Sequence, residues 1–97
     1  MEATLPPRFD ASYLDNPPPR YPPISRRLGE QGRVLLRVEV SASGDPLAVL
    51  VHQGSGFSRL DQSAVDAVRA WRFVPARRGQ QAVTEWVVVP VVFSLTR

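Results

Sequence analysis

Residues 84–95, with the sequence Thr-Glu-Trp-Val-Val-Val-Pro-Val-Val-Phe-Ser-Leu, constrain the fold more than any other stretch. They are rich in β-branched and aromatic residues and too few for a typical helix, so they predict a strand. Pro90, in the middle, has no N–H, and such a proline is tolerated only where its position faces away from the neighbouring strand. The strand is therefore predicted to lie at an edge of its sheet.

Successive residues of a strand direct their backbone N–H and C=O groups to opposite sides. With Pro90 facing outward, the backbone groups predicted to face the open edge are those of Trp86, Val88, Val92 and Ser94. Those of Val87, Val89, Val91 and Phe93 would face the rest of the sheet. A long apolar edge risks aggregation, and one reason to leave it exposed is that another chain pairs with it. A symmetric homodimer through the same edge is the alternative.

Four more elements are predicted upstream of this strand. A short helix within residues 24–32 follows Tyr21-Pro22-Pro23, and strands at 33–41 and 47–53 flank a turn at Ser43-Gly44-Asp45-Pro46. Apolar residues recur at helical spacing over residues 58–71, and residues 76–82 form a basic loop before the last strand.

This order, helix-strand-strand-helix-strand, predicts an α+β fold. The hairpin makes its two strands antiparallel, and the helical crossover leaves room for the first strand between the other two. We expect a single three-stranded antiparallel sheet of order 2-1-3, with both helices packed on one face. Topology and Pro90 place the last strand at the same edge.

Ninety-seven residues are enough for one domain. Most of the ten prolines precede residue 24, so residues 1–19 are predicted to be a proline-rich lead-in and residues 20–97 the folded domain. Phe9, Tyr13 and Leu14 leave two possibilities open for the lead-in: it lies against the domain, or it is a loose tail.

The sequence offers little for catalysis. His52 is the single histidine, and there is no cysteine, no cluster of metal ligands and no phosphate-binding loop, so we expect no catalytic residue, metal or cofactor. Twelve scattered arginines against nine acidic residues give a net charge of +3, and no apolar run reaches the about 18 residues of a membrane span. Nucleic-acid binding through Arg69, Arg72, Arg77 and Arg78 is a minor alternative, because the neighbouring Trp71 and Phe73 suit a core better.

Several short motifs, in this order and spacing, resemble the C-terminal domain of the TonB family over about residues 16–95. They are Tyr21-Pro22, Gly32-Arg-Val34, Ser43-Gly44, Ser55-Gly56 with Leu60-Asp61 and Ala64, Ala70-Trp-Arg-Phe-Val-Pro75, and Val-Pro-Val-Val-Phe93. The combination of Trp-Arg-Phe-x-Pro with the preceding Leu-Asp helix and the upstream Tyr-Pro is fairly specific.

The resemblance implies the periplasmic domain of an energy transducer. In that family an N-terminal helix, which this chain does not contain, anchors the protein to the inner membrane and engages proton-driven motor proteins there. The domain grips the TonB box, a short peptide of an outer-membrane transporter, which adds as a strand beside the last strand. The proton motive force is thereby coupled to the import of iron–siderophore, haem or cobalamin.

Transferred residue by residue, the peptide-binding positions are Trp86, Val88, Val89, Pro90, Val92 and Ser94. An auxiliary binding region falls on Pro19, Arg20, Tyr21 and Pro22. The chain departs from the family at two positions. Pro18 stands where some members carry glutamine, and Pro90 stands where several members have a residue with an N–H, so one hydrogen bond to the peptide would be absent.

Overall fold

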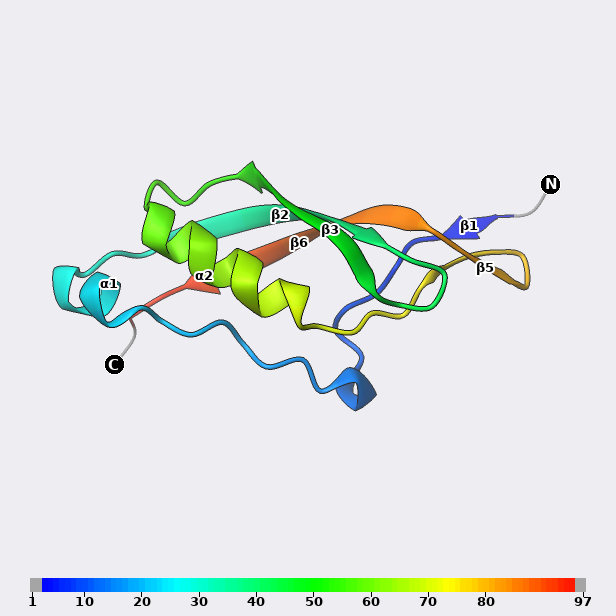
Figure 1. Cartoon of the computed structure of the whole chain (residues 1–97), viewed down its shortest axis with the longest axis horizontal. Helices are drawn as coiled ribbons and strands as arrows, with labels where there is room; N and C mark the ends of the chain where they lie inside the picture. The colour runs from blue at the N-terminus through cyan, green and yellow to red at the C-terminus, as the bar shows by residue number, and fades with distance from the viewer. Residues whose placement is uncertain (1–2, 96–97) are drawn as a thin grey trace.

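Three strands form the central antiparallel sheet of the computed structural model, which describes residues 3–95. They are β2 (Gly32–Val40), β3 (Pro46–Gln53) and β6 (Glu85–Phe93), in the order β3-β2-β6 (Figure 1). The alternating sequence of β2 explains its central place, because every second side chain from Val34 to Val40 is fully buried. The predicted order 2-1-3 is therefore found in this sheet, with the last strand at an edge.

Helix α2 (Ser58–Arg69) covers one face of the central sheet. Its buried residues are Leu60, Ala64, Val65 and Val68, which lie on one side of the helix because they are spaced by three or four positions. Trp71 and Phe73, which follow the helix, are also buried and complete the core. The core assignment of these two aromatic residues is therefore confirmed.

Helix α1 (Pro23–Leu28) corrects the prediction that both helices pack on one face of the sheet. It lies beyond the end of the sheet (Figure 1), and its apolar residues Ile24 and Leu28 are 47% and 64% exposed. The helix has only six residues and ends at Gly29 in the left-handed conformation, so it is too short to reach across the sheet.

A second three-stranded antiparallel sheet corrects the expectation of a single sheet. It contains β1 (Thr4–Leu5), β4 (Ala76–Arg78) and β5 (Gln81–Val83), in the order β1-β4-β5. The predicted basic loop is thus a small hairpin, which turns at Gly79 with a φ of 62°. β4, the central strand of this sheet, pairs with β1 of the lead-in, so the sheet depends on a contact between distant parts of the chain.

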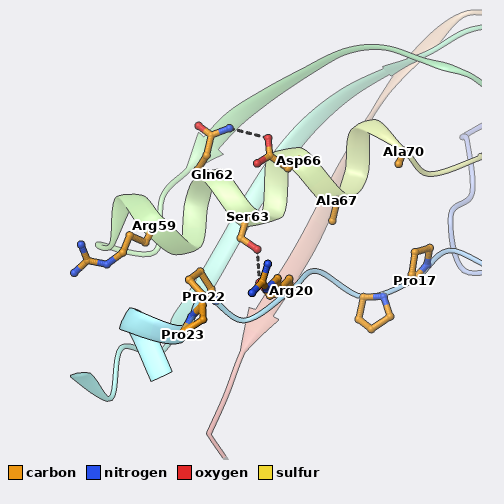
Figure 2. A pocket seen from close by; sticks show the side chains of 11 residues that line it. Pro17, Arg20, Pro22, Pro23, Arg59, Gln62, Ser63, Asp66, Ala67 and Ala70 are labelled. Atoms are coloured by element: carbon orange, nitrogen blue, oxygen red, sulfur yellow. Dashed lines mark hydrogen bonds between the residues drawn. The ribbon is translucent and has the colours of Figure 1, made fainter. Parts of the chain in front are cut away.

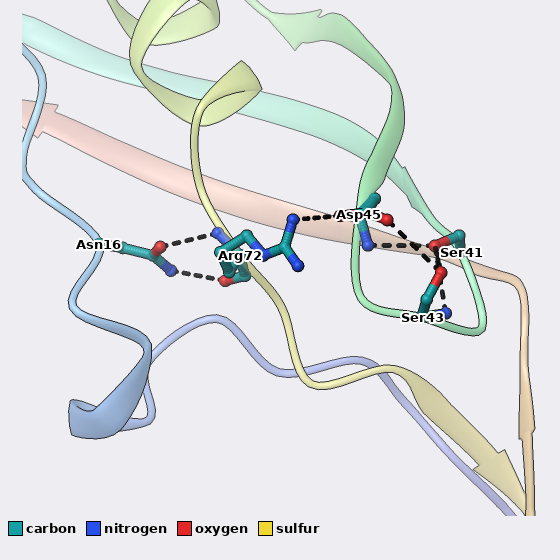
Figure 3. Close-up of polar contacts among 5 residues, drawn as sticks. All are labelled: Asn16, Ser41, Ser43, Asp45 and Arg72. Atoms are coloured by element: carbon teal, nitrogen blue, oxygen red, sulfur yellow. Dashed lines mark hydrogen bonds and ion pairs between the residues drawn. The ribbon is translucent and has the colours of Figure 1, made fainter.

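The lead-in is docked along the domain rather than being a loose tail (Figure 1). Phe9 stacks on Trp71 with ring centroids 6.3 Å apart. The side chain of Asn16 bonds the backbone of Arg72 twice, donating to the carbonyl and accepting from the N–H, both at 2.8 Å (Figure 3). A one-turn 3-10 helix at Ser12–Leu14 interrupts the segment, and Tyr13 there is exposed.

The turn between β2 and β3 is fixed to the chain that leaves α2. Gly44 accepts a hydrogen bond from the N–H of Phe73 at 2.9 Å, and a Cβ at Gly44 would overlap the carbonyl oxygen of Phe73. Asp45 in the same turn forms an ion pair with Arg72 (Figure 3). The hairpin tip therefore needs glycine for a close backbone approach, not only for its positive φ.

A candidate strand-docking edge

Strand β6 forms one edge of the central sheet. It pairs with β2 in an unbroken register of nine residue pairs, from Gly32–Phe93 to Val40–Glu85, and no strand lies on its other side within residues 3–95. Leu35 stands opposite Pro90. Because Pro90 has no N–H, this pair must be of the kind that exchanges no hydrogen bonds, and alternation then turns every second backbone group of β6 outward.

The positions predicted to face the open edge are exposed. Trp86, Val88 and Val92 are 37%, 45% and 68% exposed, and Pro90 and Ser94 are also exposed, with Ser94 just beyond the end of β6. The N–H of Trp86 donates to the side chain of its neighbour Glu85 at 3.4 Å, as expected for an N–H that points away from β2. The edge thus presents a row of backbone groups flanked by apolar side chains.

Val89 differs from the other predicted peptide-binding positions. Its side chain is fully buried, and it stands opposite Leu36 of β2. By the alternation that Pro90 sets, its backbone bonds inward. Val89 therefore holds β6 in the sheet, and any direct contact with an added strand falls to its exposed neighbours.

The auxiliary region lies at the end of β6. The ring of Tyr21 packs edge-on against Phe93, the last residue of β6, with centroids 5.4 Å apart, and its hydroxyl donates to the backbone carbonyl of Glu30. The carbonyl of Arg20 accepts a hydrogen bond from the hydroxyl of Ser63 on α2. Pro19 and Pro22 are partly buried beside them. The structure thus brings Tyr21, which the sequence places far from the last strand, next to it.

A buried carboxylate fixes this end of the molecule. Glu30 is 8% exposed, and the guanidinium of Arg59 on α2 donates to both of its oxygens, at 3.0 and 3.4 Å. The nearby Ser25 hydroxyl and the guanidinium of Arg59 lower the pKa of the Glu30 carboxyl below its usual value. Sequence reasoning missed this pair, because the two residues are 29 positions apart and neither belongs to a recognisable motif.

A second feature lies away from the edge. A groove of about 690 Å³ separates the lead-in from α2 (Figure 2). One wall is lined by Pro17, Pro18, Pro22 and Pro23, and the other by Ser63 and Ala67 of α2 and by Ala70 just after the helix. Its walls are linked at one end by the indole N–H of Trp71, which donates to the carbonyl of Pro17 at 2.7 Å. The groove contains no arrangement suited to acid–base or nucleophilic chemistry.

The described residues offer no other candidate centre. No group of three or more metal-ligating side chains occurs in residues 3–95, and His52 is exposed near the end of β3. Over the same residues, no helix has the length and apolar character needed to cross a membrane. The free edge of β6 is thus the feature best suited to a partner.

Comparison with known proteins identifies the family. Residues 17–95 match the model of the C-terminal domain of the Gram-negative bacterial TonB protein. The chain is 52% identical over 89 residues to the protein tonB2 of Pseudomonas aeruginosa, which covers 92% of this chain and 33% of that protein. It is 41% identical over 86 residues to the TonB of Xanthomonas campestris (89% and 39%) and 34% identical over 77 residues to the TonB of Vibrio cholerae (79% and 32%).

The chain thus spans between 32% and 39% of the length of these relatives. In each of them the match covers most of this chain, and the family match includes the auxiliary region and β6. The resemblance seen in the short motifs is confirmed: this chain belongs to the TonB C-terminal family.

Proposed function

We propose that this domain is the partner-binding end of a TonB-like energy transducer in the periplasm. A TonB box peptide of an outer-membrane transporter adds as a strand to β6. An inner-membrane anchor outside this chain engages the proton-driven motor proteins. The domain thereby couples the proton motive force to the import of iron–siderophore, haem or cobalamin. The family match supports the transducer, and the free edge supports the mode of binding.

The observation that carries the proposal is the regular, unoccupied edge of β6. The lead-in does not fill this edge, because its strand β1 pairs with β4 instead. An added strand therefore finds outward N–H and C=O groups at Trp86, Val88 and Val92, and a lone outward C=O at Pro90.

The energetics of such an edge suit a transducer that must release its partner. Each backbone hydrogen bond contributes about 0.5–1.5 kcal/mol net, so the few outward groups of β6 give a modest, reversible affinity. Pro90 removes one donor from the row. Bonds arranged side by side along a strand are loaded together when the partner is pulled along it, so they resist force better than their equilibrium strength suggests.

An NMR titration of the whole chain with synthetic TonB box peptides tests the proposal. We expect amide shifts at Trp86, Val88 and Val92 that saturate with peptide, and smaller shifts around Tyr21 at the end of the strand. Shifts confined to α1 and α2 would place the docking site elsewhere and refute strand addition to β6. A scrambled peptide of the same composition controls for non-specific binding.

A second candidate is a symmetric homodimer through β6, or binding of another envelope protein at the same edge. The exposure of Val88 and Val92, at 45% and 68%, favours it, because apolar edges associate. Sedimentation velocity over a range of concentrations separates the two. A monomer that binds the peptide supports the transducer, whereas a dimer that excludes the peptide supports self-association.

A further inference from the structure

Arg37 is placed where a strand added to β6 would meet it. It lies on the face of the sheet opposite to the buried residues of β2, in register with Val88 on β6 and Leu50 on β3. Its guanidinium sits over the ring of Trp86, 4.7 Å from the centroid. Trp86 belongs to the edge strand, so the stack carries the positive charge of a central strand toward the free edge.

This stack holds the guanidinium in a fixed place without neutralising it. A cation over an aromatic face is attracted by the ring, and a stacked arginine keeps the N–H groups at its rim free to bind a carboxylate. Arg37 forms no ion pair with any residue in the described part of the chain. Trp86 is 37% exposed, so the site is open to a ligand from the edge side.

Two carboxylates flank this site in sequence, and either could in principle compete with a ligand for Arg37. Glu39 is on the same face of β2, directly opposite Trp86, and Glu85 precedes Trp86 on β6. Neither the Glu39 nor the Glu85 carboxylate forms an ion pair with Arg37, and the Glu85 carboxylate accepts a hydrogen bond from the N–H of Trp86 instead. The guanidinium is therefore oriented by Trp86 but left without a carboxylate.

We propose that Arg37, held on Trp86, recognises an acidic side chain of the added strand, at the position beside Trp86 on this open face of the sheet. The inference rests on the proposed strand addition to β6. Neighbouring strands lie about 4.8 Å apart, and directly opposed side chains have Cβ atoms about 4.5–5.5 Å apart. A glutamate at that position therefore reaches the rim of the guanidinium, while the alternate side chains of the same strand meet Val88 and Val92.

The preferred partner strand is thus not any extended peptide. It carries one aspartate or glutamate beside Trp86. Its apolar residues recur at two-residue intervals along Val88 and Val92, and their side chains lie on the same face of the added strand as the carboxylate. Backbone bonds would supply most of the affinity, and the carboxylate would set register and choice of partner.

The test uses the whole chain and two capped synthetic octapeptides of alternating threonine and valine, with either glutamate or glutamine at one central position. We expect the glutamate peptide to bind about threefold more tightly, the size of an exposed, oriented ion pair. The preference should vanish in Arg37→Gln, be partly kept in Arg37→Lys, and shrink at high salt.

Arg33→Gln is the matched control, because Arg33 lies on the same face of β2, opposite Val92, and its loss changes the net charge equally. It should leave the preference intact. A preference that persists in Arg37→Gln, or that Arg33→Gln abolishes equally, overturns the inference and indicates attraction by overall charge.

Failure of this inference differs from failure of the proposed function. Equal binding of the two peptides, with shifts at Trp86, Val88 and Val92, overturns the role of Arg37 and leaves strand addition standing. Absence of any shift along β6 with either peptide, or with TonB box peptides, overturns strand addition itself and the inference with it.

Discussion

The two edges of the central sheet are equally apolar but differ in regularity. On β3, Leu50 and Val51 are 50% and 46% exposed, values close to that of Val88 on β6. The register of β3 against β2 shifts twice, between Leu35 and Leu36 and between Glu39 and Val40. The register of β6 against β2 has no shift over its nine pairs.

Regularity, more than hydrophobicity, therefore separates the edge proposed to accept a strand, β6, from the opposite edge, β3. Each irregularity in β3 leaves a residue of that strand without a partner and bends the strand, which is how natural sheets protect an exposed edge. Helix α2 also packs closest to β3 (Figure 1). β6 has neither protection, so a foreign strand can pair along its whole length.

The largest expected effect concerns the two sides of β6 itself. Val89→Pro should destabilise the domain by about 3 kcal/mol or more, because it removes an inward hydrogen bond, leaves a buried carbonyl of β2 unpaired and disturbs the core. The natural Pro90 next to it is tolerated because it faces outward. Urea unfolding measures the change, and Val89→Ala controls for the lost side-chain packing. If the Val89→Pro variant were as stable as Val89→Ala, the conclusion that the backbone of Val89 faces β2 would be wrong.

The next effect tests whether β6 stays open because the lead-in is anchored elsewhere. Asn16→Ala removes three hydrogen bonds, two to the backbone of Arg72 and one to the carbonyl of Phe9. We expect a loss of about 1–2 kcal/mol, which lowers the melting temperature by about 4–16 °C in a domain of this size. Peptide affinity should stay the same. A fall in affinity would show that a released lead-in competes for the edge of β6.

A smaller effect concerns the outward backbone groups of β6. Val88→Pro removes one outward donor of β6 and should weaken peptide binding by about two- to tenfold, because one hydrogen bond contributes about 0.5–1.5 kcal/mol. Val92→Pro should act in the same way. Val88→Thr should change little, since it keeps the N–H. Isothermal titration calorimetry with a TonB box peptide measures all three.

Val51→Pro is the matched substitution on the other edge. Leu36 of β2 stands opposite both Val51 and Val89. Because its backbone groups point toward Val89 on β6, the pair with Val51 exchanges no hydrogen bonds, and the backbone of Val51 faces away from β2. It should therefore leave peptide binding unchanged while Val88→Pro weakens it. Equal losses from the two prolines would mean that both edges bind, and the irregular register of β3 would then offer no protection.

The regular elements of the fold could be predicted because each carries its own local signal. Pro90 and the apolar run around it identify the edge strand, and the spacing of Leu60, Ala64 and Val68 identifies α2. The second sheet could not be predicted, since strands of two or three residues show no periodicity. Its pairing of the lead-in with β4 depends on contacts between distant residues.

The candidate site was predictable in the same uneven way. The backbone edge follows from one proline and the alternation of a strand, so the exposed positions Trp86, Val88 and Val92 are found from sequence. The stack of Arg37 on Trp86 requires the register of β2 against β6, which no local pattern contains. Val89 is buried while Val88 and Val92 are exposed, so a resemblance that covers the whole stretch does not by itself separate its inward from its outward positions.

The smallest expected effect is a dependence of the stability of the fold on acidic pH. It arises from Glu30, near the end of β6 where Tyr21 packs. The pKa of Glu30 lies below its ordinary value of 4.5, so ionised Glu30 stabilises the fold above that value. This contribution is lost as the pH falls through the lowered pKa of the folded state. Glu30→Gln should therefore be less stable than the native chain at neutral pH and lose less stability on acidification, as thermal melts between neutral pH and pH of about 3 would show. Asp10→Asn, at an exposed carboxylate in the lead-in, is the control for the change in net charge. Parallel curves for Glu30→Gln and the native chain would mean that the ion pair with Arg59 does not fix this end of the edge.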